Sequence, residues 1–180
     1  FARDYHGVGE LAADKDGRIK ALRFTALADH GAFNSHVSAS KLPAGLFSIC
    51  TGSYAIAKAY CRVDAVYTNK APGGVAYRCS LRVTEAVYLV ERMIDVLAQK
   101  LGLDKAEIRR RNFVKAEQFP YTTSLGWTLD SGNYHAALEK VLKAVDYDGL
   151  RREQAEKRAR GELMGIGIST FTEIVGAGPT

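Results

Sequence analysis

The stretch with the clearest chemical potential is a glycine-containing segment around Cys79. Its sequence, Gly-Gly-Val-Ala-Tyr-Arg-Cys-Ser-Leu-Arg, occupies positions 73–82. The two glycines would let the backbone pass close to a ligand, because they carry no side chain. Cys79 lies between Arg78 and Arg82, shortly before a segment with helical periodicity. Positive charge and a nearby helix N-terminus both favour the thiolate form of a cysteine over the thiol.

A thiolate at this position has more than one conceivable role. It is a soft ligand suited to Cu(I), and it is also a nucleophile suited to covalent catalysis. A cysteine at the base of a helix can equally be a core residue without a chemical role. The segment by itself leaves all three interpretations open.

The chain before this segment predicts β structure. Residues 7–28 are expected to form a hairpin that turns at 14–17, where Gly17 can adopt a positive φ. Residues 62–68 alternate and contain β-branched side chains, which predicts a strand. A loop is then expected over residues 69–82, because its Pro-Gly-Gly sequence interrupts regular structure.

The chain after the loop changes to a helical period. Apolar residues recur at helical spacing and predict an amphipathic helix over residues 84–100. Thr84 is the expected N-cap and Gly102 the expected stop. The residues that set this period are Val87, Val90, Ile94 and Leu97.

The remaining elements complete an α+β pattern. Asp104 and Glu107 have the spacing of a capping box, which predicts a helix over 105–112. Residues 113–132 are expected to be irregular. Strands followed by helices and a single last strand favour an α+β fold over repeated βαβ units. The last predicted elements are helices over 134–145 and 148–160 and a strand over 163–172.

Composition excludes several classes of protein. The 180 residues are 47% hydrophobic and 25% charged, as in a globular protein, and their formal net charge is +5. The basic residues alternate with acids in helical patterns, so we expect a solvated helix face or a subunit contact rather than a nucleic-acid site. They form two clusters: Arg109, Arg110, Arg111 and Lys115, then Arg151, Arg152, Lys157, Arg158 and Arg160.

The cysteines and the hydropathy pattern restrict the kinds of site and the cellular compartment that we expect. Cys50, Cys61 and Cys79 contain no Cys-x-x-Cys pair, which excludes a disulfide framework, a zinc site and an iron–sulfur cluster within this chain. A reducing cytoplasm is the expected compartment. No apolar run approaches the roughly 20 residues needed to span a bilayer.

The segment Ala-Tyr-Arg-Cys-Ser-Leu-Arg at positions 76–82 resembles the active-site loop of a known family. In the large, molybdenum-binding subunits of aerobic carbon monoxide dehydrogenases, this loop is Ala-Tyr-Arg-Cys-Ser-Phe-Arg. Leu81 replaces the family's phenylalanine and keeps its apolar character. Related enzymes of the wider xanthine dehydrogenase and aldehyde oxidase family carry Arg-Gly at positions 78–79, so Cys79 is the discriminating residue.

Further motifs extend the resemblance over most of the chain in a matching order. They occupy 68–72, 106–113, 119–123, 130–134 and 171–179. The resemblance identifies residues 1–180 as an internal piece of the molybdopterin-binding region, truncated at both ends. Gly7-Val8-Gly9-Glu10 spells the family's catalytic glutamate motif, but that motif lies far towards the family's C-terminus. We therefore expect Glu10 to be an ordinary strand residue.

The resemblance implies a specific chemistry for the complete enzyme, which would oxidise CO with water to CO2. Its cofactors would be molybdenum held by molybdopterin cytosine dinucleotide and a Cu(I) ion held by the Cys79 thiolate. Arg78 would be a second catalytic residue, assisting beside the cofactor. The resemblance also implies a cofactor-binding set: Gly73, Gly74, Ala76, Tyr77 and Arg78.

The resemblance also implies partners. An iron–sulfur small subunit with [2Fe-2S] clusters and a medium subunit with FAD would receive the electrons, in a dimer of heterotrimers. The enzyme would lie in the cytoplasm or at the inner face of the membrane and would not bind nucleic acid. The piece alone is not expected to be active. Two alternatives remain: a copper-free molybdenum hydroxylase acting on aldehydes or heterocycles, and a non-catalytic basic interaction module.

Overall fold

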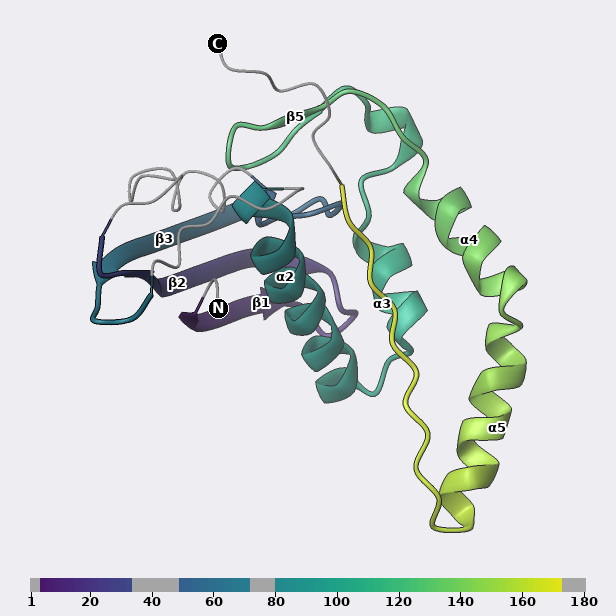
Figure 1. The fold of residues 1–180 in the computed structure, drawn as a ribbon. Helices are drawn as coiled ribbons and strands as arrows, with labels where there is room; N and C mark the ends of the chain where they lie inside the picture. Colours follow the sequence, from purple (N-terminus) through teal and green to yellow (C-terminus); the bar gives the residue numbers. More distant parts are fainter. Residues whose placement is uncertain (1–3, 34–48, 72–79, 173–180) are drawn as a thin grey trace.

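The fold, taken from a computed structural model, has a three-stranded sheet packed against helix α2, with helices α3, α4 and α5 following along the chain (Figure 1). The structure describes residues 4–33, 49–71 and 80–172, with the backbone alone at 80–83. Among these residues, the three long strands precede helices α2 to α5, and only two strands of two residues each lie between helices. The predicted α+β class is therefore confirmed.

The sheet combines a hairpin with a parallel third strand. Strands β1 (Tyr5–Ala13) and β2 (Ile19–Gly31) are antiparallel, and β3 (Lys58–Tyr67) runs parallel to β2, in the order β1-β2-β3. In the hairpin turn, the Asp14 carboxylate accepts from the backbone N–H groups of Asp16 and Arg18 at 3.1 and 2.9 Å. Gly17 takes a φ of 81°, which a residue with a side chain rarely adopts. The predicted hairpin and strand are confirmed.

Helix α2 spans Ser80–Leu101 and begins four residues before the predicted start at Thr84. The predicted cap is wrong, since Thr84 is inside the helix and its hydroxyl donates to the Glu85 carboxylate. The predicted loop over 69–82 is too long, because residues 80–82 are helical. The sequence between Gly74 and Thr84 contains no proline or glycine, so these residue types permit a helix that begins before Thr84. The predicted stop is confirmed: Gly102 has a φ of 64°.

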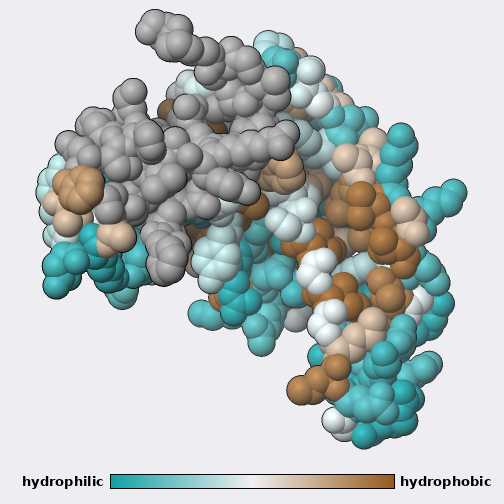
Figure 2. Space-filling model, viewed as in Figure 1, coloured by the Kyte–Doolittle hydropathy of each residue, from teal (hydrophilic) through white to brown (hydrophobic). Residues whose placement is uncertain are grey.

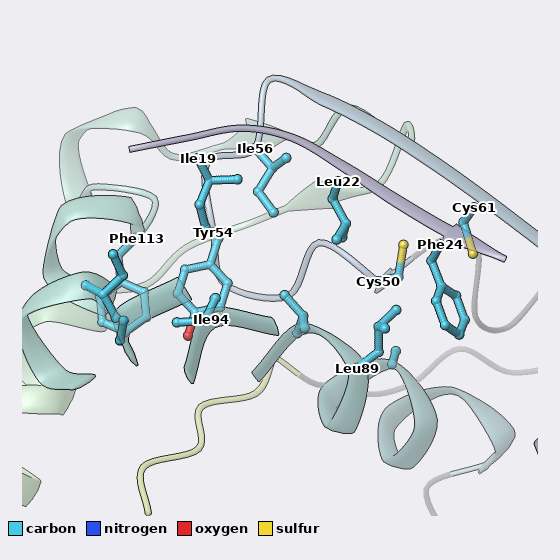
Figure 3. Close-up of a cluster of buried hydrophobic side chains, with 14 of the residues drawn as sticks. Ile19, Leu22, Phe24, Cys50, Tyr54, Ile56, Cys61, Leu89, Ile94 and Phe113 are labelled. Atoms are coloured by element: carbon cyan, nitrogen blue, oxygen red, sulfur yellow. The ribbon is translucent and has the colours of Figure 1, made fainter. Parts of the chain in front are cut away.

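The core lies between α2 and one face of the sheet (Figure 3). The buried apolar stripe of α2 repeats at i+4 through Ala86, Val90, Ile94 and Ala98. It packs in one cluster with strand residues that share the opposite face: Leu22, Phe24, Ala26, Ala28, Cys61 and Val63. The predicted stripe is thus correct at Val90 and Ile94, whereas Val87 and Leu97 are only partly buried.

Helix α3 (Lys105–Asn112) begins as the sequence predicts. The Asp104 carboxylate caps it by accepting from the N–H groups of Ala106 and Glu107, at 2.7 and 3.3 Å. The same carboxylate accepts from the Tyr147 hydroxyl at 2.8 Å, which joins α3 to the start of α5 (Tyr147–Ala159). Glu107 pairs with Arg111 at 2.7 Å. The Asp104 side chain therefore caps α3 and also contacts the first residue of α5.

These contacts predict a pH effect at Asp104. Burial acts to raise the pKa of Asp104, but hydrogen bonds from Tyr147, Ala106 and Glu107 outweigh it and hold that pKa below its ordinary value. A carboxylate with a lowered folded-state pKa stabilises the fold above its unfolded pKa of about 3.9, and this contribution is lost as the pH falls through the folded pKa. Asp104→Asn keeps an N-cap but removes the charge.

We expect the Asp104→Asn variant of the full-length protein to be less stable than the wild type at pH 7. The difference should shrink as the pH falls below about 4, because the wild-type carboxylate then becomes protonated. Denaturant unfolding between pH 7 and pH 3 measures it. A stability difference that grows on acidification would contradict this assignment.

The second half of the chain follows the prediction closely. Residues 113–132 contain only short elements: a 3-10 turn η1 (Ala116–Gln118) and the two-residue strands β4 (Tyr121–Thr122) and β5 (Thr128–Leu129). Helix α4 (Tyr134–Ala144) then leads into α5, and both helices end within one residue of their predicted limits. The mostly irregular 113–132 region agrees with expectation.

The predicted strand over 163–172 is wrong. This segment, which runs beside α3 in Figure 1, alternates between exposed and half-buried residues but pairs with no strand among the described residues. The carbonyls of Met164, Ile166 and Ile168 instead accept from side chains, namely Gln154, Lys105 and Arg109. Alternation alone indicates a two-sided environment, whereas a strand also needs a neighbouring backbone. Hydrophobic side chains gather along this region of the surface (Figure 2).

Candidate functional site

The predicted catalytic and cofactor-binding residues all lie between positions 73 and 79. Gly73, Gly74, Ala76, Tyr77, Arg78 and Cys79 lie outside the described residues. The structure does describe the two chain segments that lead into and out of this stretch. The end of β3 and Ala71 precede it, and Ser80 of α2 follows it directly.

The segment before the loop is tied to the end of β2. The Lys70 carbonyl accepts from the Ala32 N–H at 3.0 Å. The Thr68 hydroxyl donates to the Asp29 carboxylate at 2.7 Å, and the Lys70 ammonium pairs with the same carboxylate at 3.2 Å. The hydrogen bond from Thr68, with others from Gly31 and Lys70, holds the pKa of Asp29 below its ordinary value. These contacts hold Thr68 and Lys70 against the end of β2.

The segment after the loop is the N-terminus of α2. The positive end of the helix dipole lies there, and the first turn contains no acidic residue. A thiolate at the preceding residue would be stabilised by this field and by two neighbouring arginines in the sequence, Arg78 and Arg82. These conditions fit a soft Cu(I) ion held by Cys79, because copper(I) prefers a thiolate ligand.

Helix α2 is anchored by a buried ion pair. The Arg109 side chain is 0% exposed and donates to Glu91 Oε2 from Nε and Nη2, at 3.0 and 2.7 Å. Its Nη1 lies 3.0 Å from Asp95 Oδ1, one helical turn further along α2. The prediction of a solvated basic face is wrong for Arg109, because its guanidinium faces the acids of α2. The same prediction is correct for Arg110 and Arg111, whose side chains are partly exposed.

Hydroxyl groups extend this pair to two other parts of the chain. The Tyr54 hydroxyl donates to Glu91 Oε1 at 2.5 Å and lies 3.0 Å from the Thr170 hydroxyl. Thr170 itself donates to Glu91 Oε1 at 2.9 Å. Burial and the negative charge of Glu91 raise the pKa of Tyr54, so this phenol stays protonated and acts as a donor.

The sequence carried a signal for Glu91 that the prediction did not use. Glu91 interrupts the apolar run Val-Tyr-Leu-Val-Glu-Arg-Met-Ile of the amphipathic helix, directly after the buried Val90. An acid on a buried helix face requires a partner. Which of the nearby arginines supplies it could not be derived from spacing, because the partner comes from another helix.

Cys50 and Cys61 are core residues. Both are free and 0% exposed, and they lie in the hydrophobic cluster (Figure 3). A hydrogen bond with Cys61, together with burial, raises the pKa of the Cys50 thiol. Among the described residues, no three His, Cys, Asp or Glu side chains are grouped to hold a metal.

Glu10 is a strand residue, as predicted. It lies on β1 opposite Arg23 of β2, pairs with that arginine, and is exposed. Arg23 therefore holds the pKa of Glu10 below its ordinary value, which suits an ion pair. In the part of the chain that is described, no helix has the length and apolar character needed to cross a membrane.

Comparison with known proteins shows the family to which this chain belongs. Residues 1–113 match the family described as the molybdopterin cofactor-binding domain. The carbon monoxide dehydrogenase large chain of Hydrogenophaga pseudoflava is 66% identical over 183 residues, covering 100% of this chain and 23% of that protein.

Solved structures of related enzymes have the same fold over almost the whole of this chain. A Cu,Mo-CO dehydrogenase in its carbon monoxide reduced state has a TM-score of 0.90 and 59% identity, covering 99% of this chain and 23% of that one. Quinoline 2-oxidoreductase from Pseudomonas putida 86 has a TM-score of 0.86 and 36% identity, covering 94% and 22%. The chain thus spans about a quarter of the length of these relatives.

Proposed function

The chain belongs to the molybdopterin cofactor-binding domain family, and we propose that it is part of the catalytic large subunit of a Mo/Cu carbon monoxide dehydrogenase that oxidises CO with water to CO2. One observation carries this proposal: identity with a carbon monoxide dehydrogenase large chain is 66% over the whole chain. Identity with quinoline 2-oxidoreductase, a relative that matches almost as well in fold, is 36%. The sequence therefore favours the first group of enzymes over the second.

We assign copper to Cys79. The positive end of α2 and the absence of an acid from its first turn support a thiolate at the residue before Ser80. Copper and molybdenum together would supply the two-electron oxidation of CO. The protein's part would be to keep the thiolate deprotonated and to hold it at one place.

The other predicted residues would surround the cofactor. Gly73, Gly74 and Ala76 have little or no side chain, so the backbone could pass close to molybdopterin cytosine dinucleotide. Tyr77 would contribute to the same surface. Arg78 would assist as a fixed positive charge, since a guanidinium stays protonated throughout the accessible pH range.

Electrons would leave through partner subunits. An iron–sulfur small subunit with [2Fe-2S] clusters and a medium subunit with FAD fit this role, in a dimer of heterotrimers. We place the enzyme in the cytoplasm or at the inner face of the membrane. Nucleic acid is not a proposed partner, because basic side chains are paired with acids, as in Arg110–Glu139 at 2.6 Å and Lys157–Glu153 at 2.6 Å.

Metal analysis of the full-length enzyme, purified with its partner subunits, tests the proposal. We expect equal amounts of copper and molybdenum and CO-dependent reduction of an artificial electron acceptor. Removing the copper with a Cu(I) chelator should abolish CO oxidation, and adding it back should restore it. Molybdenum without copper, together with oxidation of an aldehyde or heterocycle, would instead establish a copper-free hydroxylase. Absence of both metals would favour an interaction module.

A further inference from the structure

We propose that Arg109 is a positioning residue, which fixes the first turn of α2 relative to the extended segment 163–172. The inference rests on the proposed function, because the first turn of α2 directly follows Cys79. Arg109 lies in α3, outside the loop itself, and would act through α2. Its role would be to set where the residue before Ser80 lies, without contact with the metal.

The contacts of Arg109 restrain α2 in two directions. Glu91 and Asp95 are one turn apart on the same helix, and both contact this one guanidinium. Glu91 Oε2 accepts a hydrogen bond at 2.7 Å, whereas Asp95 Oδ1 forms an ion pair with Nη1 at 3.0 Å without a hydrogen bond. Two carboxylates at i and i+4 that contact one guanidinium restrict both sliding of α2 along its axis and rotation about it. Ser80 lies eleven residues before Glu91, about 16 Å along a rigid helix at 1.5 Å per residue.

The same guanidinium also holds the C-terminal segment. Arg109 Nη2 donates to the Ile168 carbonyl at 2.7 Å, and Nη1 donates to the Lys105 carbonyl at 2.9 Å. Thr170 reaches the network through Glu91 Oε1 at 2.9 Å. Segment 163–172 has no strand partner in the described chain, so these side-chain contacts set its position. Arg109 thus joins α2, α3 and this segment, as does Lys105 through Asp95 at 2.8 Å and the Ile166 carbonyl at 3.2 Å.

A contribution to stability is a weak reason for burying the charged Arg109 side chain between α2 and α3. Burying a guanidinium and a carboxylate is costly, and well-packed apolar residues of similar volume often give an equally stable fold. A guanidinium differs in its planar set of donors, which engages acceptors only in defined directions. Three acceptors receive hydrogen bonds from Arg109, namely Glu91, Lys105 O and Ile168 O, and the Asp95 carboxylate forms an ion pair with it. This arrangement suits a role in geometry.

Variants of the full-length holoenzyme test the role. Arg109→Lys keeps the charge but loses the fork, and Glu91→Gln keeps the shape but loses the charge. Arg110→Lys is the matched control, because Arg110 is the neighbouring, partly exposed residue of α3 and pairs with the exposed Glu139. Three quantities are measured on folded, molybdenum-containing enzyme: copper per molybdenum, kcat and KM for CO, and amide hydrogen exchange of residues 69–82 relative to residues 19–31.

We expect Arg109→Lys to reduce copper per molybdenum about threefold or more and to lower kcat with it. Exchange of residues 69–82 should rise about tenfold while exchange of the sheet is unchanged. Glu91→Gln should give smaller changes in the same direction, and Arg110→Lys none. A purely structural Arg109 would lower thermal stability but leave the copper ratio and the exchange ratio at wild-type values, and that result would overturn the proposal.

Two further outcomes are decisive. If Arg109→Lys does not fold, Glu91→Gln carries the test, and wild-type copper and exchange ratios in that variant would reject the positioning role. If wild-type enzyme contains no copper, the proposed function fails, but the exchange measurement still decides the positioning of α2 independently of the metal.

Discussion

Replacing Cys79 with serine in the full-length enzyme is expected to remove copper and CO oxidation together. Serine supplies a hard, neutral oxygen that is far less acidic than a thiol, so copper should fall at least about tenfold. Molybdenum and molybdopterin should remain, because groups other than Cys79 would hold them. Elemental analysis, pterin content and CO-dependent acceptor reduction measure these three outcomes on one sample.

The other two cysteines provide matched controls. Cys50→Ser and Cys61→Ser place a hydroxyl in the hydrophobic core, where both residues are 0% exposed, so they should reduce stability. Neither should change the copper content of the protein that folds. The assignment of copper to Cys79 is wrong if Cys79→Ser enzyme keeps full copper and full CO oxidation.

Asn112→Ala is expected to cause a large loss of stability. Asn112 is 5% exposed, and its Oδ1 accepts from the Ile19 N–H at 2.8 Å. Its Nδ2 donates to the carbonyls of Gly17 and Ile108, both at 2.8 Å. Alanine would leave the Ile19 N–H and the Gly17 carbonyl without this partner in a buried place. We expect the free energy of unfolding to fall by about 2–4 kcal/mol.

Asn133→Ala is the matched control for this substitution. Asn133 caps α4 by accepting from the Ala136 N–H at 3.0 Å, and it is exposed. Its loss should cost only about 1 kcal/mol, because water can replace the cap. Denaturant unfolding of both full-length variants provides the comparison. Equal losses would show that the join between the hairpin turn and α3 contributes no more than a surface cap.

Local chemistry in the sequence was sufficient for most element boundaries. Asp14 and Gly17 determine a turn, Gly102 ends α2, and Asp104 begins α3, because each acts on backbone groups within a few residues. The start of α2 was misplaced because Thr84 has the chemistry of a cap, whereas the helix already includes the four residues before it. A residue that can cap a helix can also lie inside one, so its type alone does not decide where the helix begins.

The partners of the buried charge and of the C-terminal segment depend on contacts that no local pattern contains. The sequence by itself determined the α+β order and the family resemblance, and the role of Cys79 stays a prediction from that resemblance. Only the tertiary structure decided that Arg109, rather than Arg110 or Arg111, is the buried partner of Glu91. It also decided that segment 163–172 is held by side chains instead of a neighbouring strand. Both outcomes depend on which elements pack together, and a charge or an alternating segment is compatible with several partners until that packing exists.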